Sequence, residues 1–239
     1  MTSIEILSNI YQLDGISMAR NPNTEMREKI LEVAFDLFYA GGLNAVSMED
    51  IADKVGVKKA NLFHYYHSKN DLILAVFDHG TSFMQEQILK RFCDTKTDPI
   101  QVFEGMFVDI MDCMKKNACS RGCFIGNLAQ EMSDHHEVLR KRMSDFIGQW
   151  KACLTQYLKG WKSVGYFKKD FRPESAAEAI LSAFEGSILF CKAEKKVSAV
   201  ESTQFMVIHF LKSFKVKKCC PIANVFSCFS WKKHKDNGG

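Results

Sequence analysis

The segment from Ser47 to Lys69, SMEDIADKVGVKKANLFHYYHSK, constrains the fold of this chain more than any other. Ile51 and Val55 stand one helical turn apart after Ser47, whose hydroxyl can accept a hydrogen bond from an amide of the first turn. Asp50 lies three residues beyond Ser47, which is the spacing of a capping box. The pattern predicts a short helix that begins after Ser47.

A second helix is expected shortly after the first. Gly56 tolerates a positive φ and can end the first helix. The next helix should run from about Lys58 to Tyr66, with Leu62 and Tyr66 on its inner side. Two short helices joined by a glycine turn are the arrangement that places a helix in the major groove of DNA. The outward side chains that could read bases are Lys59, Ala60, Asn61 and His64.

Charge supports this reading only locally. Between Asp53 and Asp71 every formally charged side chain is a lysine, which suits contact with phosphates. The wider region, residues 24–70, has six basic and seven acidic residues. On spacing and charge alone, a plain helical hairpin with a solvated lysine face is an equal alternative.

The chain from Met26 to about Asp78 resembles the N-terminal domain of the TetR family of bacterial transcriptional regulators. The resemblance rests on REKILEVAFDLFYAGGLNAVSMEDIADKVGVKKANLFHYYHSKNDLILAVF, which follows the family pattern nearly throughout. It implies an all-α protein, with an N-terminal three-helix DNA-binding domain that contains a helix-turn-helix. A C-terminal helical bundle for ligand binding and dimerisation would follow.

Roles in DNA binding follow from the resemblance position by position. Ser47 and Lys69 match phosphate-contacting positions, and Tyr65 matches a position that contacts the DNA backbone. Two departures stand out, since Lys58 occupies the place of a Ser or Thr cap and Phe63 replaces a frequent Tyr. The candidate DNA-binding residues are Ser47, Lys58, Lys59, Ala60, Asn61, His64, Tyr65 and Lys69.

Length and composition agree with two helical domains. The chain has 239 residues, 46% of them hydrophobic, and four prolines. We expect an extension at 1–23, a DNA-binding domain at 24–70, a ligand-binding and dimerisation domain at 71–216, and a basic cysteine-containing tail at 217–239 that is disordered. The sequence has no run typical of a membrane span and no signal core, which predicts a cytoplasmic protein without membrane contact.

Helices in the second domain are predicted from apolar spacing and caps. Ser68, Asp134 and Ser198 are expected N-caps, and Pro173 suits a first helical turn. Residues 122–132 fit either a short helix or an irregular segment. The expected helices span about 68–92, 100–116, 134–164, 173–191 and 198–216.

In the TetR family the last two helices pair with those of a second subunit. The resemblance therefore implies a homodimer whose two recognition helices read a near-palindromic operator in double-stranded DNA. The alternative for these helices is a bundle within one subunit. The residues expected at the dimer contact are Ala176, Ala177, Ala179, Ile180, Ala183, Phe184, Ser187, Phe205, Ile208, His209 and Leu211.

The resemblance also implies an inducer pocket, and large apolar side chains could line it, although each on its own is more typical of plain core. Residues 122–134 resemble a segment at the pocket edge in some family members, where its motion can couple to the DNA-binding domains. Asn127, Gln130 and Glu131 are then polar anchors or a solvated face. The candidate pocket residues are Met106, Phe107, Ile110, Met111, Met114, Phe124, Leu128, Met143, Phe146 and Trp150.

Nine cysteines suggest three alternatives: buried structural thiols, a sensor of electrophiles or oxidants, and half of a metal site. Cys119 and Cys123 flank Arg121 and are the best sensor candidates, because a nearby positive charge favours the thiolate. No second ligand pair completes a metal site, and we predict neither a metal nor a cofactor.

The resulting hypothesis is a dimeric transcriptional repressor that a small apolar or aromatic ligand releases from its operator. Thiol sensing through the same DNA-binding domain is the first alternative, and regulation by a protein partner is another. A Cys/His enzyme is the weakest, since no phosphate loop or nucleophile motif is present. Repression is inferred from how members of the family usually act, and an activator would carry the same helix-turn-helix.

Overall fold

The computed structural model describes residues 22–92 and 96–216, and these residues form helices with one isolated bridge, Phe167 to Lys215. The predicted all-α class is confirmed. Most of the predicted extension and all of the tail lie outside the described residues. The helices are α2 (Pro22–Gly41), α3 (Met48–Val55), α4 (Lys59–Tyr65), α5 (Lys69–Phe92), α6 (Pro99–Lys116), α7 (Phe124–Met132), α8 (Glu137–Ser163), α9 (Pro173–Glu194) and α10 (Ser198–Phe214).

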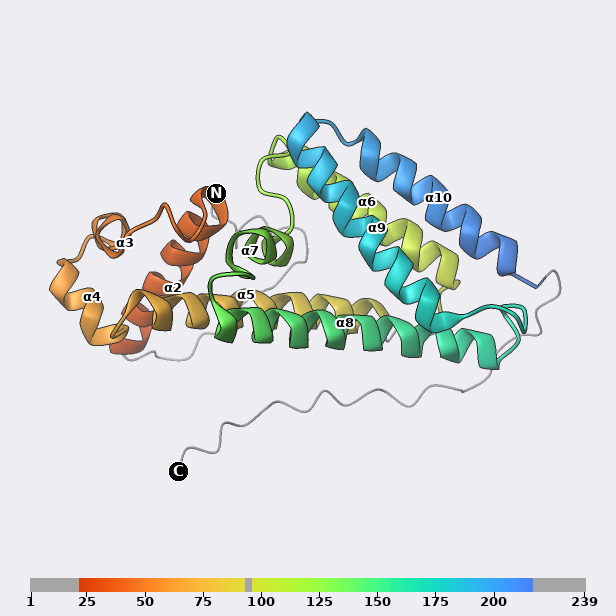
Figure 1. The fold of residues 1–239 in the computed structure, drawn as a ribbon, viewed down its shortest axis with the longest axis horizontal. Coiled ribbons are helices and arrows are strands. Elements are labelled where there is room, and N and C mark those ends of the chain that lie inside the picture. Colours follow the sequence, from red (N-terminus) through yellow and green to blue (C-terminus); the bar gives the residue numbers. More distant parts are fainter. Residues whose placement is uncertain (1–21, 93–95, 217–239) are drawn as a thin grey trace, which may run out of the picture.

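The helices α2, α3 and α4 form one end of the molecule (Figure 1). The predicted capping box is complete, because Ser47 Oγ accepts from the Asp50 amide at 3.1 Å and Asp50 Oδ2 accepts from the Ser47 amide at 2.7 Å. Gly56 ends α3 with φ 84° in the left-handed region, as its place in the sequence predicted.

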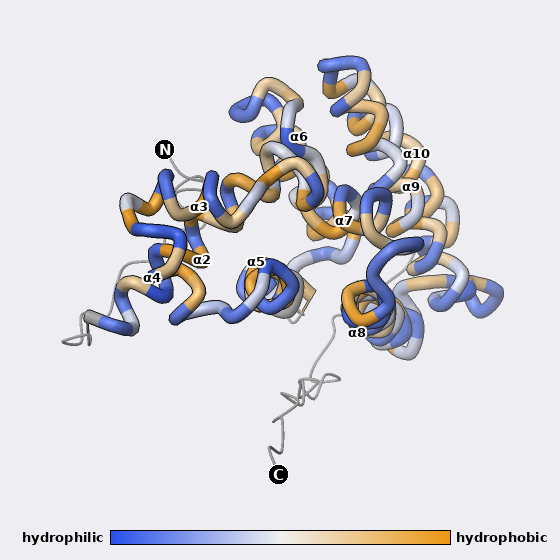
Figure 2. Tube along the Cα trace, turned by 60° about the vertical axis from the view of Figure 1, so that its left-hand side comes forward, coloured by the Kyte–Doolittle hydropathy of each residue, from blue (hydrophilic) through white to orange (hydrophobic). Residues whose placement is uncertain are grey.

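The remaining helices form the larger body. The long helices α5 and α8 lie side by side, α9 packs against both α8 and α10, and α6 packs against α10 (Figure 1). The short helix α7 lies between this body and the end formed by α2, α3 and α4. Hydrophobic and hydrophilic residues alternate along each helix (Figure 2), as expected for helices that bury one side. No helix within the described ranges could span a membrane.

Several predicted helix starts are confirmed and one is shifted. Ser68 Oγ accepts from the Asp71 amide at 3.0 Å, so Ser68 caps α5 as predicted. Pro173 is the first residue of α9. Ser198 is not a cap, because α10 begins at Ser198 itself and Val197 occupies the N-cap without a side-chain hydrogen bond.

The prediction that Asp134 caps the long helix is wrong. The helix α8 begins at Glu137, and His136 is its N-cap, with Nδ1 accepting from the Leu139 amide at 3.1 Å. The preceding helix ends at Met132, whose carbonyl accepts from the His136 amide at 2.9 Å. A turn between the two helices therefore takes up Asp134.

A polar cluster joins the N-terminal end of α6 to the C-terminal end of α10. The Asp98 carboxylate accepts from Tyr166 Oη at 2.7 Å, from Lys215 Nζ at 2.8 Å and from the Ile100 amide at 2.9 Å. Burial alone would raise the pKa of Asp98, but these donors outweigh it and hold the pKa below its ordinary value. The ionised carboxylate therefore stabilises the fold.

Replacing Asp98 with Asn should destabilise the protein in a pH-dependent way. The contribution of a carboxylate with a depressed pKa is present above its ordinary pKa of about 4 and is lost as pH falls through the folded value. Asp98→Asn should lower the Tm by about 2 °C at pH 7, a modest change because the pair is partly exposed. Thermal unfolding at several pH values should show the difference in Tm between wild type and Asp98→Asn disappearing below about pH 4. A difference that stays constant with pH would contradict this account.

Candidate DNA-binding surface and its coupling to the regulatory helices

The helix α4 presents one side to solvent and buries the other. Leu62 is fully buried and Tyr66, at the C-cap, is 3% exposed, so both anchor the helix as predicted. The four residues predicted to reach base edges, Lys59, Ala60, Asn61 and His64, are all exposed. Phe63 is 38% exposed, which places part of its ring on the same surface instead of in the core.

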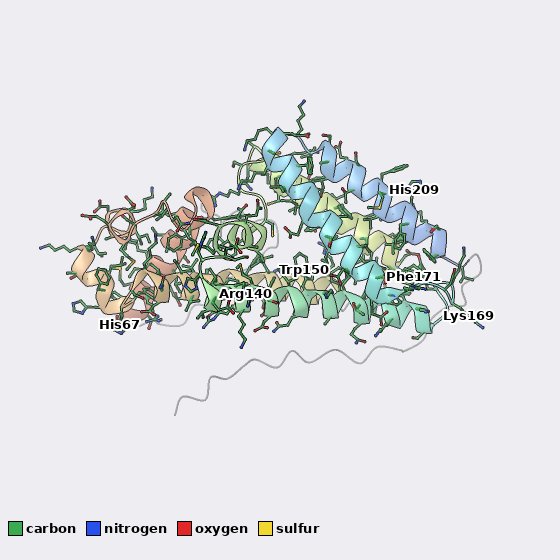
Figure 3. The ribbon with its side chains drawn as sticks, in the orientation of Figure 1. His67, Arg140, Trp150, Lys169, Phe171 and His209 are labelled. Carbon is green, nitrogen blue, oxygen red and sulfur yellow. The ribbon has the colours of Figure 1, made fainter. Side chains whose placement is uncertain are left out.

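The other predicted DNA-binding residues lie before α3 and at the two ends of α4. Ser47 and Lys58 are exposed, and Tyr65 and Lys69 are half-buried at the junction of α4 with α5. Lys58 forms no side-chain cap, in agreement with its departure from the family pattern. His67, which sequence reasoning did not single out, is also exposed at this end (Figure 3).

One of the residues predicted to contact bases already forms an ion pair within the chain. Lys59 Nζ lies 3.2 Å from Glu49 Oε2, and both side chains are more than half exposed. Exposed ion pairs of this kind contribute little to stability. A guanine could therefore replace Glu49 as the partner of Lys59 at small cost.

Two basic residues of α2 position α3 and α4, and sequence patterns indicated no role for them beyond their charge. Arg27 donates to the Tyr65 carbonyl at 3.2 Å, and its guanidinium lies over the Tyr66 ring, 4.7 Å from the centroid. Lys29 Nζ donates to the Val55 carbonyl at 2.9 Å, at the C-terminal end of α3. These contacts join α2 to two other helices, α3 and α4, over 26 and 38 positions of sequence, so helical periodicity could not reveal them.

The helix α7 connects the DNA-binding end to the larger body. The Glu131 carboxylate accepts from the amides of Leu43 at 2.9 Å and Asn44 at 2.6 Å, in the connection between α2 and α3. Asn127 donates to the Arg121 carbonyl at 2.6 Å and accepts from Lys192 of α9 at 2.9 Å. Glu131 and Asn127 thus make inter-helix contacts, whereas Gln130 bonds within α7 and is exposed.

The loop that precedes α7 also contacts α2. Arg121 Nη1 lies 3.1 Å from Asp36 Oδ1, and Tyr39 Oη donates to the Gly122 carbonyl at 2.5 Å. Tyr39 is further packed against Phe124, with ring centroids 5.7 Å apart. Burial raises the pKa of the Tyr39 phenol far above its ordinary value, so it remains a hydrogen-bond donor.

The predicted pocket residues pack into the interior. Eight of the ten are buried, and Ile110 and Met111 are half-buried. Trp150, labelled on α8 in Figure 3, packs edge-on against Phe146 and Phe184. Its Nε1 is buried, and no residue of the described chain accepts a hydrogen bond from it.

A cavity of about 580 Å³ adjoins part of this set, between the C-terminal end of α2, the helix α7 and the C-terminal end of α9. Two predicted pocket residues, Phe124 and Leu128, line it together with all three predicted polar anchors. Its other walls come from helices that sequence reasoning did not connect, including Tyr39 of α2 and Lys192 of α9.

The sulfur atoms of the two sensor candidates contact different partners. Cys119 is buried, and its sulfur lies 3.2 Å from the sulfur of Cys191 on α9. The Cys123 sulfur accepts from the Gly126 amide at 3.5 Å and so caps α7. Burial and the Glu185 carboxylate raise the pKa of Cys123 well above its ordinary value. Arg121, expected to favour their thiolates, is paired with Asp36 instead.

Of the residues predicted for dimer contact, some are buried within the protomer and others are exposed. Seven are buried within the protomer, because α9 also packs against α8 and α10: Ala176, Ala177, Ile180, Phe184, Ser187, Ile208 and Leu211. Ala179, Phe205 and His209 are exposed, and Ala183 is half-buried. His209 lies on the outer side of α10 (Figure 3). Phe190 and Phe205, 58% and 65% exposed, and Leu189 and Met206 add apolar surface on the same two helices.

Two family models match the chain. The model for bacterial regulatory proteins of the tetR family matches residues 30–76, and the model for the tetracyclin repressor-like C-terminal domain matches residues 100–207. The matches cover the helix-turn-helix and most of the larger body.

Curated relatives and solved structures agree with the family models. An uncharacterized HTH-type transcriptional regulator in the lacX 3' region of Lactococcus lactis subsp. lactis is 27% identical over 176 residues, covering 74% of this chain and 88% of the relative. The HTH-type transcriptional repressor DhaR of Mycobacterium sp. strain GP1 is 23% identical over 193 residues, covering 81% and 93%.

Among solved structures, a TetR-family regulator from Cytophaga hutchinsonii has a TM-score of 0.72 at 21% identity and covers 84% of this chain and 100% of its own. The regulatory protein TetR from Rhodobacter sphaeroides has a TM-score of 0.71 at 22% identity and covers 77% and 97%. At these identities the likeness shows the fold alone. From the family models and the relatives together, the chain is a member of the TetR family of bacterial regulatory proteins, a transcriptional regulator and not an enzyme.

Proposed function

We propose that the chain is a dimeric repressor that reads a near-palindromic operator with α4 and leaves it when a small apolar or aromatic ligand binds. Residues 24–70 bind DNA, and residues 71–216 bind the ligand and dimerise. The observation that carries the proposal is the side of α4 that exposes Lys59, Ala60, Asn61 and His64 while Leu62 is fully buried.

Each exposed side chain of α4 has a chemistry suited to a base edge. The Asn61 amide can bond adenine through N6 and N7, and Lys59 can donate to O6 and N7 of guanine. Ser47 before α3, Tyr65 at the end of α4 and Lys69 at the start of α5 contact phosphates, which fixes the helix in the groove without reading sequence. Reading and positioning therefore fall to different residues.

Dimerisation is supported by apolar side chains that the protomer leaves exposed on α9 and α10. Phe190, Phe205 and Met206 are each about half exposed or more. Gly186, on α9, has open space where a side chain would extend, so a second helix can approach closely there. Two copies joined on this face would present two α4 helices to successive half-sites.

For the ligand, we propose the interior lined by the predicted pocket residues. The buried Trp150 Nε1 has no acceptor among the described residues, and a buried donor without a partner carries a free-energy penalty. A ligand with an aromatic body and one acceptor oxygen would bond this donor and pack against Phe107 and Phe184, which are 5.8 Å apart by ring centroid.

Release from DNA follows if the ligand prefers a different position of α7. The Glu131 carboxylate holds the amides of Leu43 and Asn44, so a shift of α7 moves the connection between α2 and α3. The loss of operator affinity then equals the ratio of the ligand's affinities for the shifted and the DNA-bound conformations.

The roles of Lys59 and Lys69 can be separated on the duplex that the protein selects from a random pool. Lys59→Ala should remove about 1–3 kcal/mol of preference for that duplex over random DNA. Lys69→Ala should weaken binding to both alike and reduce the salt slope by about 1. Fluorescence anisotropy at two salt concentrations measures both effects. Equal losses on both duplexes for both variants would contradict this division.

The dimer contact is tested by placing a charge on it. Phe205→Glu should shift the protein from dimer to monomer in sedimentation velocity at micromolar concentration, because two buried like charges would meet near the symmetry axis. Val138→Glu, at a position 54% exposed on α8, is the matched control and should leave the dimer intact. A dimer that survives Phe205→Glu unchanged would place the contact elsewhere.

Coupling through α7 can be measured without knowing the ligand. Operator binding should change amide hydrogen exchange in residues 124–132 of the wild type, and Glu131→Ala should abolish that change while leaving the protection of α4 intact. Gln130→Ala, which removes an exposed side chain bonded within α7, should behave as the wild type. An unaltered response in Glu131→Ala would show that another route couples the two parts.

A further inference from the structure

Two thiols that are 72 positions apart in sequence meet in the interior. The sulfur atoms of Cys119 and Cys191 are 3.2 Å apart, and both side chains are buried, with exposures of 4% and 0%. A disulfide needs a separation of about 2.05 Å, so the sulfur atoms would have to move together by roughly 1 Å. Cys119 belongs to the loop between α6 and α7, and Cys191 lies near the end of α9.

We propose that Cys119 and Cys191 form a reversible disulfide under hydroperoxide oxidation, and that this bond lowers operator affinity. The regulatory part rests on the proposed function, whereas bond formation does not. The sequence instead favoured Cys119 and Cys123 as two candidates for a reactive thiolate, because both flank Arg121.

The chemistry balances with a hydroperoxide as the oxidant. One thiol loses its proton and its sulfur attacks a peroxide oxygen, so that the O–O bond breaks and a sulfenic acid and one water form. The second sulfur attacks the sulfenic sulfur, the S–S bond forms, and the S–O bond breaks. The hydroxyl leaves with the second thiol proton as water. Two thiols are oxidised, and hydrogen peroxide is reduced to two waters.

The surroundings favour this pair over other described cysteines. The sulfur of Cys123 is engaged as the cap of α7. Lys195 Nζ donates to the Cys119 carbonyl at 3.1 Å, and its charge favours a nearby thiolate. Burial, with the hydrogen bond to Cys119, nonetheless raises the pKa of Cys191 to about 12. Oxidation should therefore be slow, and a small uncharged oxidant suits a buried site.

The loop that carries Cys119 also holds α2. Arg121 pairs with Asp36, and the Gly122 carbonyl accepts from Tyr39. Both α2 residues lie on the helix whose Arg27 positions α4. A bond that draws the loop toward α9 would pull on these contacts and change how α4 is presented to DNA.

The test begins with the reduced full chain and its selected duplex. Hydrogen peroxide treatment, alkylation of remaining thiols and non-reducing tryptic digestion should yield peptide Asn117–Arg121 linked to peptide Asp170–Lys192. Each peptide contains one cysteine, and none of the seven other cysteines lies in either of these two peptides. Operator affinity should fall at least about fivefold, the low end of ordinary coupling, and dithiothreitol should restore it.

Variants identify the bond responsible. Cys119→Ala and Cys191→Ser should each abolish both the linked peptide and the affinity loss, while Cys123→Ser should retain both. Absence of the linked peptide in the wild type would overturn the proposal, and its presence with unchanged affinity would overturn its regulatory part. A reduced protein that selects no duplex would instead refute the proposed function, and the peptide result would still stand or fall by itself.

Discussion

Hydrogen bonds from α7 to the connection between α2 and α3 join the two parts of the molecule. Glu131 supplies one carboxylate to two backbone amides, and Arg121 and Gly122, just before α7, add contacts to α2. Charge-assisted hydrogen bonds to backbone amides are directional and strong. They join the end formed by α2, α3 and α4 to the larger body, and in the proposed mechanism the ligand acts on α4 through them.

The close approach of α5 strengthens the same junction. A side chain at Gly80 would come within 2.7 Å of Phe35 and 2.9 Å of Phe124, so glycine lets α5 pass directly against both rings. Phe35 belongs to α2 and Phe124 to α7, and their centroids are 4.9 Å apart. An apolar contact and a polar one therefore lie next to each other where the two parts of the molecule meet.

Local features of the sequence predicted local structure well. The capping box at Ser47, the glycine end of α3 and the buried Leu62 are all short-range consequences of side-chain type and spacing, and they are present. The exposed side of α4 followed from the same periodicity. Asp134 shows the limit, because a good capping residue was displaced by a turn that the end of α7 imposes.

Contacts between distant residues could not be predicted. The pairs Arg27 with Tyr65 and Cys119 with Cys191 depend on how helices pack, which periodicity does not specify. The same holds for the inward side of α9. Its small residues suggested a dimer contact, but most of them fill the space against α8 and α10.

The most direct test of the account is selection of bound duplexes from a random pool by the purified protein. We expect enrichment of a near-palindrome whose half-sites are about 34 Å apart, or a multiple of that distance, because two α4 helices read successive major grooves. Salt-sensitive binding without any enriched sequence would contradict it, since the exposed side of α4 would then contact phosphates without reading bases.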